Sequence, residues 1–116
     1  IHCIEPLEYT DFLHLLSRAW LVASDSGGVQ EEAPSLGKPL LVLRDTTERP
    51  EVLDCGVGRL VGHSGERLEE MLETALVDES WFDTVRTTKN PFGKGDAGEQ
   101  IASAIERFFT TKTGDA

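Results

Sequence analysis

The sequence SDSGGVQEEAPSLGKP, residues 24–39, lies between two short apolar runs at residues 20–23 and 40–43. This order predicts a strand, a glycine turn, a helix and a second strand. Because glycine has no Cβ, the backbone at Gly27 and Gly28 can approach a ligand closely. The free N–H groups of the first helical turn and the positive end of the helix dipole are typical of a phosphate site. The alternative is a capping turn in which the glycines only allow tight packing.

Glu32 lies four residues after Gly28, one turn deeper on the same face of the expected helix. A carboxylate there could accept two hydrogen bonds from a ribose diol, so the pair of features suggests a nucleotide. The alternative is a solvated acidic pair with Glu31, which the helix dipole favours. The stretch lacks both the full GxGxxG pattern and the lysine of a P-loop, which disfavours a dinucleotide or P-loop site.

The loop RDTTERPE, residues 44–51, follows the second apolar run. Arg49 is a candidate phosphate ligand, since a guanidinium group matches phosphate oxygens two at a time. The alternative is a surface network of ion pairs with Thr47 as a helix cap. Phe12 lies on an apolar helix face and is interpreted either as a core residue or as an aromatic ring that stacks on a base.

The composition narrows the class of protein. The 116 residues include 21 acidic and 11 basic side chains, for a net charge of −10, and no basic run, so nucleic acid and anionic membranes are poor partners. No apolar run approaches the roughly 18 residues of a membrane span. Two cysteines without metal-ligand spacing and three scattered histidines predict free thiols in the cytoplasm and no metal site. The chain begins with Ile1, and we expect it to be part of a longer protein that holds the rest of the active site.

Strands and helices are expected to alternate along the whole chain. The pattern predicts strands at residues 1–4, 20–23, 40–43 and 59–61, and helices at 7–18, 28–36, 50–54, 65–77, 78–88 and 96–109, the last capped by Asp96. Gly37 is the expected left-handed end of its helix. This order predicts an α/β fold, a parallel sheet with helices on both faces. Ligands of such sheets bind at the carboxyl ends of the strands, where the loops after Ala23 and Leu43 lie.

The runs DSGGVQEEAPSLGKP (25–39) and LVLRDTTERPE (41–51) resemble signatures of the non-hydrolysing UDP-N-acetylglucosamine 2-epimerases, with looser matches at 59–62 and 90–93. The resemblance covers nearly the whole chain. It implies a two-domain, glycosyltransferase-like architecture built from Rossmann-like domains, of which this chain matches the later part of the second. On this interpretation residues 1–109 form a partial UDP-binding domain, residues 110–116 form a frayed tail, and the N-terminal catalytic domain is absent from this chain.

The resemblance also implies the roles of single residues. Ser26, Gly27 and Gly28 would hold the diphosphate, Glu32 the ribose hydroxyls, and Arg49 the phosphates and sugar. Phe12 would pack against uracil, and the backbone around Leu7 would read its edge. The reaction would interconvert UDP-N-acetylglucosamine and UDP-N-acetylmannosamine by elimination and re-addition of UDP, with no cofactor. The acid–base groups would precede Ile1, so no catalytic residue is expected in this chain.

Some positions depart from the family's usual pattern. The late loop has Phe92, Lys94 and Gly98, and Val57 stands where threonine is common. These positions lie outside the UDP set, and residues 63–65 are interpreted as surface.

Three alternatives stay open. A hydrolysing epimerase shares elements of these motifs. A glycosyltransferase of the same architecture should lack the TTERP loop. A non-catalytic nucleotide-binding fragment is the third, and an isolated half-sheet with an unpaired edge is expected to associate or be poorly soluble alone. The full-length protein is expected to be a cytoplasmic homodimer.

Overall fold

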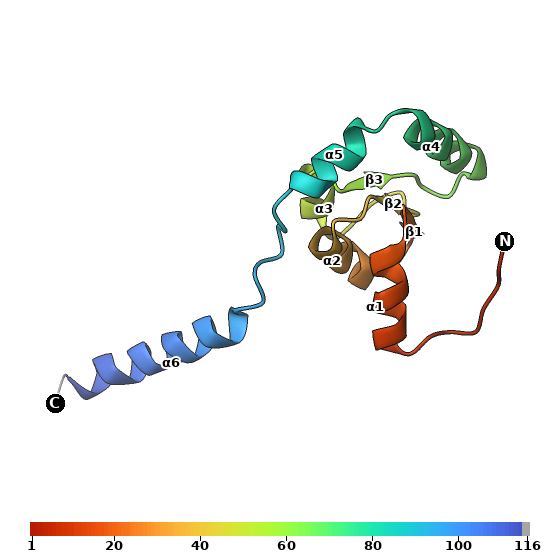
Figure 1. Cartoon of the computed structure of the whole chain (residues 1–116). Helices are drawn as coiled ribbons and strands as arrows, with labels where there is room; N and C mark the ends of the chain where they lie inside the picture. Colours follow the sequence, from red (N-terminus) through yellow and green to blue (C-terminus); the bar gives the residue numbers. More distant parts are fainter. Residues whose placement is uncertain (115–116) are drawn as a thin grey trace.

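The core of the chain is a three-stranded parallel sheet. The computed structural model describes residues 1–114, and its strands are β1 (Val22–Ser24), β2 (Leu40–Val42) and β3 (Gly58–Leu60), in the order β1-β2-β3 (Figure 1). In the register of the sheet, Ala23 of β1 pairs with Leu41 of β2, and Leu41 pairs with Arg59 of β3. All three residues of β2 are buried, as expected for the central strand of a covered parallel sheet. The predicted α/β fold is confirmed.

Helices follow each strand and flank the sheet (Figure 1). The flanking helices are α1 (Tyr9–Arg18), α2 (Gly27–Leu36), α3 (Pro50–Asp54), α4 (Gly65–Val77) and α5 (Ser80–Thr87), and a last helix, α6 (Ala97–Thr113), follows them in the chain. Gly37 ends α2 with a φ of 62°, the left-handed conformation predicted for it. Pro50 opens α3, where its fixed φ and missing N–H suit the first helical turn.

Apolar side chains between the sheet and its helices form one core. Its fully buried members include Leu40, Leu41, Val42, Val52 and Val57. Helix α5 closes this core with Trp81, Phe82 and Val85, and the Trp81 indole donates a 2.8 Å hydrogen bond to the Gly56 carbonyl. That bond satisfies the polar end of a buried indole and ties α5 to the turn before β3.

The predicted strand at residues 1–4 is wrong. Residues 1–8 are neither helix nor strand, and Ile1 and Ile4 are exposed. An apolar run becomes a strand only when a neighbouring strand pairs with it, which periodicity cannot reveal. Helix α1 also begins two residues later than predicted, because Glu8 has an extended backbone. Leu7 therefore lies in the extended segment before α1.

The last helix is longer than predicted and stands apart from the body of the molecule (Figure 1). It continues past Phe109 to Thr113, and the hydroxyls of Thr110, Thr111 and Thr113 donate to carbonyls one turn earlier. Asp96 occupies the position before α6, but its side chain makes no capping hydrogen bond within the described residues. Residues 115 and 116 of the expected tail lie outside the described residues.

Two sequence features have simple outcomes. Cys3 is exposed, Cys55 is half-buried, and both are free thiols as predicted. Within residues 1–114, no helix combines the length and apolar character needed to cross a membrane.

Candidate functional site

The glycine turn at the end of β1 opens directly into helix α2. Ser26 is the N-cap residue, with an extended backbone, and its hydroxyl accepts a 3.4 Å hydrogen bond from the Val29 amide. The amides of Gly27 and Gly28 belong to the first turn, where a helix offers no acceptor of its own. The turn therefore combines outward-facing N–H groups with the positive end of the α2 dipole, as an anion site requires.

The guanidinium group of Arg49 lies directly over Gly27. A Cβ placed on Gly27 would come within 2.7 Å of the Arg49 Nη1 atom, so only glycine leaves room for this approach. Arg49 Nε donates to Glu31 at 2.6 Å, and its Nη1 lies 3.4 Å from Glu48. The hydrogen bond to Glu31 raises the pKa of Arg49, with smaller contributions from neighbouring carboxylates. Arg49 is thus held as a fixed cation at the start of α2.

Two polar residues join α2 to the loop that carries Arg49. Gln30 is fully buried and accepts a hydrogen bond from the Thr47 hydroxyl, whose oxygen in turn accepts from the Arg49 amide at 3.0 Å. The interpretation of Thr47 as the helix cap is wrong, because Arg49 is the residue that precedes α3. The surface ion pairs of the loop are also present, with Arg44 2.9 Å from Glu48. Sequence reasoning did not single out Gln30, although its place on the same helix face as Ala33 and Pro34 is a signal for a buried polar link.

Glu32 lies next to helix α1. The Tyr9 hydroxyl donates a 2.6 Å hydrogen bond to Glu32 Oε1, which brings the segment containing Leu7 and Phe12 alongside α2. Leu7 is 40% exposed, and Phe12 is half-buried with one side against the core. Phe12 therefore packs as a core residue, as one interpretation predicted, while part of its ring stays accessible. Its role toward uracil stays a prediction, as do the ligand roles of Leu7 and Glu32.

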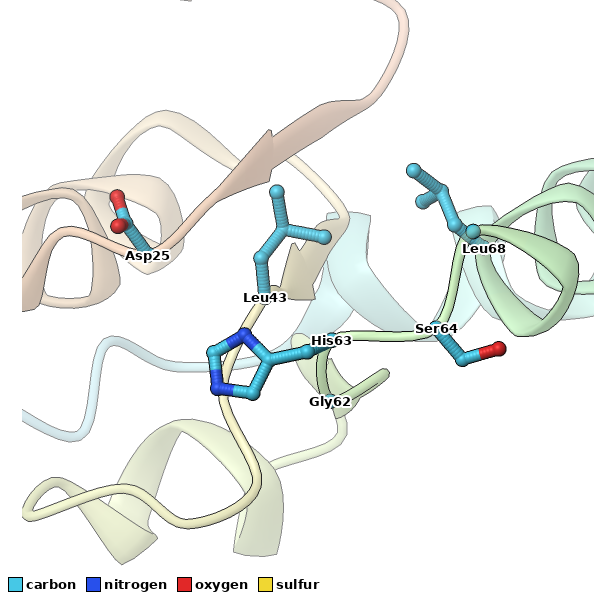
Figure 2. Close-up of a pocket in the computed structure, with 7 residues that line it drawn as sticks. Asp25, Leu43, Gly62, His63, Ser64 and Leu68 are labelled. Carbon is cyan, nitrogen blue, oxygen red and sulfur yellow. The ribbon is translucent and has the colours of Figure 1, made fainter.

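Two hollows lie at the carboxyl ends of the strands, on the edge of the sheet next to the glycine turn. One hollow of about 420 Å³ is lined by residues that include Asp25, Leu43, His63 and Leu68, and Figure 2 shows these side chains around it. A second hollow of about 340 Å³ shares Asp25, Leu43 and His63 and adds the loop with Asp45. The prediction that the loops after β1 and β2 meet at this edge is confirmed.

These hollows adjoin the predicted site without coinciding with it. Asp25, which directly precedes Ser26, lines both of them, whereas Gly27, Gly28 and Arg49 line neither. His63 Nε2 lies 3.6 Å from an oxygen of Asp45, and both side chains are largely exposed. Exposure agrees with the surface interpretation of residues 63–65, but their place at the shared edge was not predicted. In residues 1–114, no three histidine, cysteine or acidic side chains are grouped to hold a metal ion.

The fold and the candidate site define a parallel α/β protein in which the first turn of one helix lies against an arginine guanidinium group. The family model of UDP-N-acetylglucosamine 2-epimerase matches residues 1–106. The chain belongs to this family. An Escherichia coli UDP-N-acetylglucosamine 2-epimerase is 50% identical over 103 residues, which are 89% of this chain and 27% of that relative. The chain thus spans less than a third of the length of such relatives.

Two solved structures show the same fold. The UDP-GlcNAc 2-epimerase of Neisseria meningitidis, bound to UDP-GlcNAc, is 43% identical with a TM-score of 0.81 over 91% of this chain and 29% of its own. The enzyme of Methanocaldococcus jannaschii, in complex with UDP-GlcNAc and UDP, is 44% identical with a TM-score of 0.75 over 90% of this chain and 27% of its own. The predicted resemblance to UDP-N-acetylglucosamine 2-epimerases is therefore confirmed.

Proposed function

We propose that this chain is the UDP-binding part of a UDP-N-acetylglucosamine 2-epimerase that interconverts UDP-N-acetylglucosamine and UDP-N-acetylmannosamine. The observation that supports this most directly is the Arg49 guanidinium over Gly27 at the start of α2. Dipole, amides and cation converge where a diphosphate would sit. Family membership and relatives solved with UDP-GlcNAc give independent support.

The proposed chemical role follows from the charge of the leaving group. Elimination removes the C2 proton to a base, forms the C1=C2 double bond of a glucal and transfers the electrons of the glycosidic C–O bond to the UDP oxygen. UDP then adds back to C1 while C2 is protonated from the opposite face, which inverts C2 and closes the cycle. Preorganised donors at the Ser26–Gly28 turn and the fixed charge of Arg49 would stabilise that oxygen as it becomes negative. Glu32 would hold the ribose, so that UDP stays bound between the two steps. The acid–base groups are proposed to lie outside this chain.

Titration of UDP into the longest natural polypeptide that contains this chain tests the site. We expect Glu32→Ala and Arg49→Ala each to weaken binding roughly tenfold, the scale of one lost charge-assisted hydrogen bond. Glu70→Ala and Arg86→Ala are matched controls, because both side chains are exposed on α4 and α5. Unchanged UDP affinity in both site variants would overturn the assignment.

Product analysis tests the reaction itself. NMR of UDP-N-acetylglucosamine incubated with the same polypeptide is expected to show UDP-N-acetylmannosamine. Free N-acetylmannosamine with released UDP would instead identify the hydrolysing alternative. The proposed assembly is a cytoplasmic homodimer, and light scattering of the purified polypeptide measures the subunit number.

A further inference from the structure

The proposed function assigns no role to the hydrogen bond between Tyr9 and Glu32. Tyr9 is the first residue of α1 and is 62% exposed. Its hydroxyl nevertheless donates a 2.6 Å bond to Glu32 Oε1, across 23 residues of sequence. A short hydrogen bond from a largely exposed phenol to a carboxylate contributes little to a hydrophobic core. Its main effect is on the carboxylate that accepts it.

The contact restricts the orientation of the Glu32 carboxylate. An ionised carboxylate is purely an acceptor, and its terminal torsion is broad, so an exposed one rotates among several orientations. With Oε1 committed to the phenol, Oε2 points in a defined direction and keeps its lone pairs for other donors. The carboxylate raises the pKa of the Tyr9 phenol by accepting its hydrogen bond. A phenol is protonated at neutral pH even without this shift, so the Tyr9 hydroxyl is the donor.

We propose that Tyr9 is a positioning residue for nucleotide recognition. Its hydroxyl fixes Glu32 so that the remaining carboxylate oxygen meets the ribose hydroxyls, which sharpens the preference for ribonucleotides over nucleotides that lack the diol. This inference rests on the proposed function, because it assigns the ribose to Glu32. The gain comes from preorganisation, since the carboxylate no longer loses rotational freedom when the ribose binds.

The competing explanation is that the bond only fastens α1 to α2. In that case its removal would disturb the uracil and ribose contacts together, and nucleotides with and without the diol would weaken alike. A positioning role acts through Glu32 alone, so it affects only a nucleotide that has hydroxyls for Glu32 to hold. The two explanations therefore differ in a ratio of affinities rather than in one affinity.

Calorimetric titration of UDP and of 2′,3′-dideoxy-UDP measures this ratio in the longest natural polypeptide that contains this chain. Tyr9→Phe removes one hydroxyl and keeps the ring. We expect it to weaken UDP binding about three- to tenfold and to leave binding of the dideoxy analogue nearly unchanged. Thr10→Val is the matched control, since its hydroxyl is on the same helical turn and makes no hydrogen bond within residues 1–114.

A double-mutant cycle completes the test. In a Glu32→Ala background, Tyr9→Phe is expected to have no further effect on UDP binding, because the two residues act as one unit. An unchanged UDP affinity in Tyr9→Phe, an equal loss for both nucleotides, or full additivity with Glu32→Ala would overturn the inference. If the unmodified polypeptide does not bind UDP, the proposed function fails first, and this result is distinct from all three.

Discussion

Substitution of Gly27 by alanine probes the contact between Arg49 and the α2 turn. The added Cβ would lie 2.7 Å from Arg49 Nη1, whereas ordinary contacts begin near 3.4 Å, so the guanidinium must retreat by roughly 0.7 Å. The guanidinium group is the far end of a long, partly exposed side chain, and we therefore expect it to move at the expense of its hydrogen bond to Glu31 while the backbone stays. The retreat takes the cation away from the position over the helix start.

The effect on stability can be separated from the effect on the site, because the chain offers a matched control. Gly65 also follows a serine N-cap, at the first position of α4, and a Cβ there meets nothing within 4 Å. Gly65→Ala should raise the free energy of unfolding by about 0.4–1 kcal/mol through lower entropy of the unfolded chain. Gly27→Ala has the same entropic gain, but displacing Arg49 weakens its ion pair with Glu31. The free energy of unfolding of Gly27→Ala should therefore change little.

UDP titration and thermal unfolding are the assays. We expect Gly27→Ala to weaken UDP binding roughly tenfold, and Gly65→Ala to leave binding unchanged while raising Tm by about 1–4 °C. In an Arg49→Ala background, Gly27→Ala should add little, because the cation is already gone. An equal loss of affinity in both backgrounds would mean that the methyl group acts on the ligand directly, and the reasoning about Arg49 would be refuted.

Three further predictions concern stability. Gln30→Leu leaves the Thr47 hydroxyl without its buried acceptor and should lower the free energy of unfolding by about 1–3 kcal/mol in urea titrations; an unchanged midpoint would argue against the link. Trp81→Phe removes the indole hydrogen bond that ties α5 to the turn before β3. It should also lower the free energy of unfolding by about 1–3 kcal/mol, measured as faster hydrogen exchange of the core amides, and unchanged exchange rates would contradict this. Hydrogen bonds from the Ser80 side chain and amide hold the pKa of Asp78 below its ordinary 3.8, so this carboxylate stabilises the fold above that pH and loses the effect as pH falls through the lowered pKa. In Asp78→Asn, the free energy of unfolding should therefore fall less steeply with pH below about pH 4 than in the unmodified protein. The same pH dependence in both proteins would contradict this.

Local chemistry was enough to predict several elements. The left-handed end of α2 at Gly37 and the start of α3 at Pro50 follow from the backbone preferences of glycine and proline alone. The strand predicted at residues 1–4 failed because a strand depends on a partner that can lie anywhere else in the sequence. Helix α6 continues past its predicted end to Thr113, and its last threonine hydroxyls donate to carbonyls of the preceding turn; the point at which an exposed helix end frays is not encoded in composition.

The sequence by itself determined the parallel α/β fold, the glycine turn and the family, because apolar periodicity, turn chemistry and long motifs are properties of neighbouring residues. The tertiary structure alone decided that Arg49 lies over Gly27 and that Tyr9 holds Glu32. Gly27 and Arg49 are separated by 22 positions in the sequence, and Tyr9 and Glu32 by 23. Their distances depend on how whole helices and loops pack against the sheet, and no local pattern in the chain encodes that packing.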